Sequence, residues 1–124
     1  MSKIKESSTN NMNKQGILVQ CPVTFTLGKI GGRWKPLILY NLTSGKKRYN
    51  ELKKGIPDIT EKMLIQHLKE LEKDQLVLRE SLPVVPPHVK YSLTKQGKEM
   101  GPILEAMAKW GLKNSKRESA IGNR

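Results

Sequence analysis

Apolar residues recur at helical spacing around one well-defined start signal near the middle of the chain. Leu64, Leu68 and Leu71 stand at i, i+4 and i+7, which predicts a helix with one buried face. Thr60 precedes this pattern and is a good N-cap, and Glu61 follows in the first turn, where the helix dipole favours a negative charge. The opposite face of this predicted helix is polar and basic, apart from Ile65.

Three further helices are expected before Thr60. The first begins at Cys21-Pro22, because proline suits the first helical turn, and ends at the glycine pair 31–32. The second covers about 33–43, with an apolar stripe in which Trp34 is expected to be a core anchor. A short third helix follows the basic run 46–48, and the proline in the turn after it prevents a continuous helix.

Two strands and a final helix are expected after the Thr60 helix. The run 76–82 carries Leu76, Leu78 and Leu82 with intervening polar residues, which predicts a strand, and alternation in 88–93 predicts a second strand. A proline-rich tip joins the two strands. The last helix starts after Thr94, where Gly97 and Pro102 predict a kink.

This order of elements predicts an α+β, mostly α fold, a winged helix-turn-helix with a two-stranded wing. In that fold the second helix of the pair enters a DNA major groove while the wing lies against the flanking backbone. The last helix carries an apolar stripe that the winged domain does not need for its own core, so we expect extra terminal helices to form a dimer contact. The residues of that stripe are Met100, Ile103, Leu104, Met107 and Trp110.

The charge of the chain points to a polyanionic partner. The 124 residues have a formal net charge of +12, and most of this excess lies between the two polar ends, so the ends do not explain it. Neutralised phosphates release condensed counterions, which favours binding of such a protein to nucleic acid.

Other classes of protein find little support in the sequence. No apolar run approaches the roughly 18 residues that span a bilayer, and the first residues lack a secretory pattern, so we expect a cytoplasmic protein. Two histidines and one cysteine supply neither a metal set nor a nucleophile with its base, so we expect no enzyme, no metal and no cofactor. The expected domains are a mobile N-terminal tail (1–20), a winged domain with its dimerisation helix (21–112) and a polar, frayed C-terminal tail (113–124).

Seven motifs along the chain resemble those of the HxlR family of bacterial transcriptional regulators, relatives of the MarR-type winged helix proteins. They are CPV at 21–23, IGGRW at 30–34, KRYNEL at 47–52, IPDITEKML at 56–64, LKELEKDQLV at 68–77, VPPHVKYSLTKQG at 85–97 and WG at 110–111. The resemblance implies a homodimer that binds a short inverted repeat of double-stranded DNA near the promoter it regulates. A small-molecule effector stays unidentified.

Within this frame the sequence predicts three groups of DNA contacts. The residues expected to read bases from the recognition helix are Thr60, Lys62, Met63, Ile65, Gln66 and Lys69. Those expected to contact the DNA backbone are Lys46, Lys47, Arg48 and Lys73. Those expected on the wing are Arg79, His88 and Lys90. The alternative for the helix lysines is an ordinary solvated face.

The single cysteine, Cys21, has two interpretations. Some members of the family sense electrophiles or oxidants through a cysteine at this position, and a helix N-terminus favours the reactive thiolate. A lone cysteine is also commonly a small buried packing residue. A sensor with one cysteine would need a partner thiol on another subunit or a small molecule.

A second hypothesis from another class is a basic winged-helix interaction module that binds RNA or a protein partner. Recognition of single-stranded RNA relies on exposed aromatic platforms. The chain has few aromatic residues, and Trp34, Tyr49, Tyr91 and Trp110 lie in apolar stripes. Duplex DNA is therefore the favoured partner.

Overall fold

The computed structural model describes residues 11–12, 18–19, 21–86 and 88–122, and the chain divides into two units between Gly31 and Gly32. The first unit holds the antiparallel strands β1 (Asn11–Met12) and β2 (Leu18–Val19) and helix α1 (Pro22–Ile30). Helix α1 starts as predicted, with Cys21 at the N-cap and Pro22 in the first turn. The predicted mobile tail, residues 1–20, otherwise lies outside the described residues.

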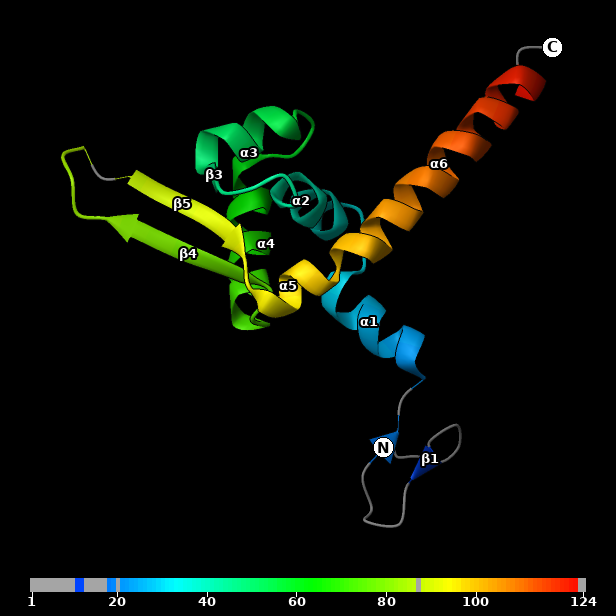
Figure 1. The fold of residues 1–124 in the computed structure, drawn as a ribbon, viewed down its shortest axis with the longest axis horizontal. Helices are drawn as coiled ribbons and strands as arrows, with labels where there is room; N and C mark the ends of the chain where they lie inside the picture. Colours follow the sequence, from blue (N-terminus) through cyan, green and yellow to red (C-terminus); the bar gives the residue numbers. More distant parts are fainter. Residues whose placement is uncertain (1–10, 13–17, 20, 87, 123–124) are drawn as a thin grey trace. The chain divides into compact units, whose positions relative to one another are not determined.

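The second unit has the predicted winged helix-turn-helix fold (Figure 1). Its elements in order are α2 (Trp34–Leu42), β3 (Lys47–Arg48), α3 (Tyr49–Gly55), α4 (Glu61–Lys73), β4 (Val77–Leu82), β5 (His88–Leu93), α5 (Lys95–Glu99) and α6 (Gly101–Gly122). The α+β, mostly α class is confirmed. No helix in the described ranges combines the length and apolar character required to cross a membrane.

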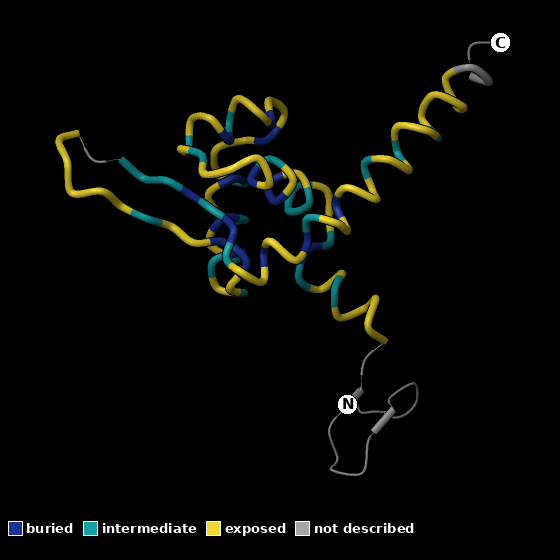
Figure 2. Tube along the Cα trace, viewed as in Figure 1, coloured by how far each residue is buried: buried dark blue, intermediate teal, exposed yellow. Residues whose placement is uncertain are grey.

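The core of this unit lies where α2, α3 and α4 meet (Figure 2). Its fully buried side chains are Ile38, Leu39, Leu52, Ile59, Leu64, Leu68 and Leu71. Each such side chain contributes about 1.5 to 3 kcal/mol relative to leaving it exposed. The expectation that Trp34 anchors the core was wrong: Trp34 is only partly buried, and the Arg33 guanidinium lies 4.5 Å from its ring centroid. The buried face of α2 is centred instead on Ile38 and Leu39.

The sheet has three strands in the order β3-β5-β4, one more than predicted. The two residues of β3 carry no strand pattern of their own and are ordered by pairing, Lys47 with Tyr91 and Arg48 with Lys90. Of the three leucines noted in the run that forms β4, Leu76 is buried, whereas Leu78 and Leu82 are exposed. Val77 is also buried and pairs with buried Leu93, so Leu78 and Leu82 lie on the opposite face of the sheet.

The predicted kinked final helix is two helices separated at Met100. The Thr94 hydroxyl accepts a hydrogen bond from the Gly97 N–H at 3.0 Å, which caps α5. A side chain at Gly97 would collide with the Leu76 carbonyl oxygen, so the close packing of α5 on the start of β4 requires glycine. Pro102 is accommodated because it lies in the first turn of α6.

The prediction that the chain frays from about Lys113 was wrong, because α6 continues to Gly122. The lysine, arginine and glutamate residues of this segment have good helix propensity, and a helix already started upstream needs no new nucleus. In Figure 1 most of α6 extends away from the helices of the core.

Candidate nucleic-acid interface

Helix α4 presents its basic side to solvent because its apolar side is fixed in the core. The Thr60 hydroxyl accepts a hydrogen bond from the Met63 N–H at 3.2 Å, which starts the helix as expected. The predicted base-reading residues Thr60, Lys62, Ile65, Gln66 and Lys69 are all exposed, as is Lys73, and Met63 is partly buried. Ile65 is 43% exposed on this polar face. An apolar contact with a thymine methyl group would suit it.

The predicted backbone contacts surround the start of α3. Arg48 is the N-cap residue of α3, and its backbone N–H donates to Glu51 Oε1 at 2.7 Å. The Arg48 side chain has no acceptor for the first N–H groups of the helix and makes no capping bond. Lys46 is exposed and its Nζ lies 3.0 Å from Glu80 Oε1 on the wing. Exposed pairs of this kind contribute little, at most about 1 kcal/mol, so a phosphate can replace the carboxylate.

The strand register divides the basic wing residues between two faces of the sheet. Residues directly opposite one another share a face, and neighbours along a strand alternate. One cross-strand row consists of Lys47, Tyr91 and Arg79, and the adjacent row consists of Arg48, Lys90 and Glu80. The predicted wing residues are thus separated: His88 and Lys90 share a face with Arg48, whereas Arg79 lies on the other face with Lys47.

A hydrogen-bonded cluster that the sequence analysis missed stands beside the outer face of α4. Gln66 Nε2 donates to Glu70 Oε2 at 3.2 Å, and Lys35 Nζ of α2 lies 2.7 Å from Glu70 Oε1. His67 Nδ1 lies 3.5 Å from the same Oε1 atom. Hydrogen bonds from Lys35 and then Gln66 lower the pKa of Glu70 to about 2. The i, i+4 spacing of Gln66 and Glu70 was a usable signal, but the Lys35 contact joins two helices.

The Cys21 thiol is exposed at the N-cap of α1. The backbone N–H groups of Thr24 and then Val23 favour the thiolate and lower the pKa of Cys21. Its exposure in this chain disagrees with the interpretation of Cys21 as a buried packing residue.

The structure divides the residues predicted for the dimer contact into two sets. Met100 and Leu104 are buried within the chain, whereas Ile103, Met107 and Trp110 are exposed, Trp110 by 70%. An apolar hollow of about 250 Å³ lies beside them between α2 and α6. Its lining is Pro36, Leu37, Tyr40, Leu104, Met107 and Ala108.

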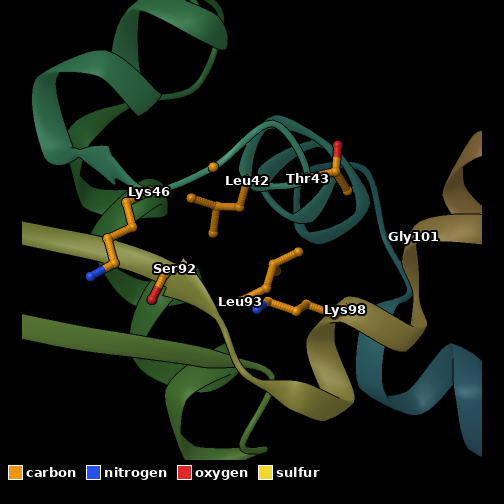
Figure 3. Close-up of a pocket in the computed structure, with 8 residues that line it drawn as sticks. Leu42, Thr43, Lys46, Ser92, Leu93, Lys98 and Gly101 are labelled. Carbon is orange, nitrogen blue, oxygen red and sulfur yellow. The ribbon is translucent and has the colours of Figure 1, made fainter.

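A second hollow, of about 400 Å³, lies between the end of α2, strand β5 and the α5–α6 junction (Figure 3). Leu42 and Leu93 provide its apolar surface, and Lys46 and Lys98 are among its lining residues. The Thr43 hydroxyl at its edge already donates to the Tyr40 carbonyl oxygen at 2.6 Å. None of the base-reading residues of α4 lines this hollow.

Comparison with known proteins agrees with this geometry. A family model described as HxlR-like helix-turn-helix matches residues 29–119. The HTH-type transcriptional regulator YybR of Bacillus subtilis is 48% identical over 102 residues, which cover 82% of this chain and 78% of YybR.

Two solved structures extend the comparison. The redox regulator HypR in its reduced form is 45% identical with a TM-score of 0.76, and the match covers 81% of this chain and 99% of that one. Diamide-treated YodB of Bacillus subtilis is 37% identical with a TM-score of 0.64, covering 76% of this chain and 94% of YodB.

Proposed function

The chain belongs to the HxlR-like helix-turn-helix family, and we propose that it is a transcriptional regulator that binds a duplex operator sequence-specifically as a homodimer. One observation carries this proposal: Leu64, Leu68 and Leu71 fix one side of α4 in the core, so that its basic side faces solvent. Such a helix fits the major groove, where side chains can reach base edges.

The roles of the individual residues follow from their positions. The exposed residues of α4 read bases, with Gln66 suited to adenine and Lys62 and Lys69 suited to guanine or phosphate. Lys46, Lys47, Arg48 and Lys73 contact the DNA backbone, where they add affinity without sequence preference. Arg79 and the pair His88 and Lys90 approach the duplex from the two faces of the wing. No residue of the chain is assigned a catalytic role.

The exposed apolar residues of α6 support the homodimer. Ile103, Met107 and Trp110 expose apolar side chains on α6, Met107 also lines the hollow between α2 and α6, and a second copy would remove these side chains from water. Met100 and Leu104 are buried within the chain and pack the start of α6 against it. Two copies related by a two-fold axis would read half-sites about 34 Å apart, one turn of DNA.

We further propose that Cys21 makes DNA binding responsive to oxidants or electrophiles. Its exposure and lowered pKa favour the reactive thiolate. Of the similar proteins, HypR is described as a redox regulator and YodB has been solved after treatment with diamide. The chain has one cysteine, so oxidation would join it to Cys21 of a second copy or to a small thiol. Treatment with diamide should change operator affinity of the wild type and leave Cys21→Ser unchanged. Equal behaviour of the two proteins would exclude Cys21 as the sensor.

Selection of bound duplexes from a random pool tests the main proposal. We expect one enriched inverted repeat, bound by two copies of the chain. On that operator Gln66→Ala should lose discrimination at particular base pairs by about 1 to 3 kcal/mol, whereas Arg48→Ala should weaken all sequences alike. A pool without enrichment, or tighter binding to single-stranded RNA than to any duplex, would favour the interaction-module alternative.

A further inference from the structure

We infer that Glu70, anchored by Lys35, is a positioning residue that orients the Gln66 amide for base recognition. This inference rests on the proposed function, because it assigns the sequence preference of α4 to a contact between two helices. Glu70 itself touches no base in this arrangement. It acts through Gln66.

The hydrogen bond between the two side chains determines how the amide is oriented. A carboxylate only accepts hydrogen bonds, so the Gln66 NH₂ group must face Glu70 Oε2, from which it lies 3.2 Å. One amide hydrogen is used in this bond, while the second hydrogen and the amide carbonyl oxygen stay free. Those two groups are the pair with which glutamine binds the N7 and N6 positions of adenine.

Glu70 is itself held from a different element. The Lys35 ammonium of α2 lies 2.7 Å from Glu70 Oε1, so each carboxylate oxygen has its own partner. The Lys35 side chain is only 14% exposed, which distinguishes this pair from the exposed ion pairs common on helix surfaces. A glutamine oriented in advance loses less conformational freedom on binding than a free one, and preorganisation of this kind strengthens the correct contact.

The alternative is an ordinary i, i+4 pair on a helix surface, which would stabilise α4 slightly and have no effect on sequence preference. Two variants of equal charge distinguish the cases. Glu70→Ala removes the acceptor that orders Gln66, and Glu72→Ala removes a partly buried carboxylate two positions away on the same helix. Both raise the net charge by one, so their effect on general DNA affinity is matched.

The experiment measures wild type and variants on the selected operator and on operators changed at one base pair. Gln66→Ala defines the base pair that Gln66 reads, where it should lose about 5- to 150-fold of discrimination. Glu70→Ala should lose about fivefold or more of the discrimination at that same base pair and at no other. Lys35→Met should do the same, and Glu72→Ala should leave the preference unchanged.

The outcomes separate this inference from the proposed function. A wild type without preference for any duplex would refute the proposed function. A selective wild type in which Gln66→Ala changes no single position, or in which Glu70→Ala behaves like Glu72→Ala, would overturn the positioning role alone. A direct measurement covers the case of an unstable variant: the Gln66 side-chain amide resonances of the free wild type should show slow hydrogen exchange relative to Gln96, an exposed glutamine on α5. Equal exchange rates would also overturn the inference.

Discussion

Replacing Leu68 by alanine tests whether α4 is held in the way the structure indicates. Leu68 is 1% exposed, and the change removes three carbon atoms from the core. At about 0.8 kcal/mol per buried carbon the transfer loss alone is about 2.4 kcal/mol, and the cavity left behind brings the range to about 2 to 5 kcal/mol. The total free energy of unfolding of a small domain is about 5 to 15 kcal/mol, so Leu68→Ala should lose a large and readily measured part of it.

Ile65→Ala is the matched control, because it lies on the opposite side of the same helix and is 43% exposed. We expect it to lower the free energy of unfolding by less than about 1 kcal/mol. For operator affinity the order of the two variants should be reversed. Ile65→Ala should weaken operator binding, while Leu68→Ala should keep the wild-type affinity per folded molecule.

Urea unfolding followed by circular dichroism gives the free energies, at one fixed protein concentration because dimer formation adds to apparent stability. Operator titration gives the affinities under conditions in which each variant is folded. A Leu68→Ala loss below about 1 kcal/mol, or equal losses of stability in both variants, would show that α4 is not held by its leucine face.

Three further outcomes are expected. Thr60→Ala should lower the free energy of unfolding by about 1 kcal/mol, because the Met63 N–H loses its acceptor. Thr60→Ser should retain most of the wild-type stability, because serine keeps the hydroxyl. A urea titration in which both variants match wild type would exclude a stabilising role for this cap. The pKa of Glu70 is depressed from 4.5 to about 2, so its stabilising contribution is complete above about pH 4.5 and is lost as the pH falls towards 2. Thermal unfolding at a series of pH values should therefore show the difference between wild type and Glu70→Gln shrinking over that interval, and a constant difference would contradict it. Arg48→Ala should reduce the slope of log affinity against log salt by about 1, as one phosphate contact is lost, while Lys113→Ala on α6 should leave that slope unchanged.

The sequence was sufficient to predict the elements whose signals lie among residues close together in the chain. The spacing of Leu64, Leu68 and Leu71 and the cap at Thr60 depend only on neighbours along one helix, and the structure agrees with both. The exposed positions on the other side of α4 then follow from geometry.

Features that depend on contacts between distant segments were missed. Strand β3 forms because it pairs with β5, and the residues Lys47 and Arg48 carry no sequence pattern typical of a strand. The Lys35 contact with Glu70 requires α2 and α4 to lie side by side. The wing residues were grouped by sequence proximity, whereas the register alone decides that Arg79 and Lys90 point to opposite faces.

Strand β5 is paired on both sides, with β3 at Lys47–Tyr91 and Arg48–Lys90 and with β4 along its whole length. The backbone that leads into α3 and the hairpin that projects from the body are therefore parts of one sheet. A protein engineer who transplants the hairpin alone into a relative would sever the Lys47 and Arg48 pairing and disturb the beginning of α3. A segment exchanged between relatives to change DNA specificity should accordingly begin before Lys47 and end after Leu93, so that all three strands are transferred as one unit.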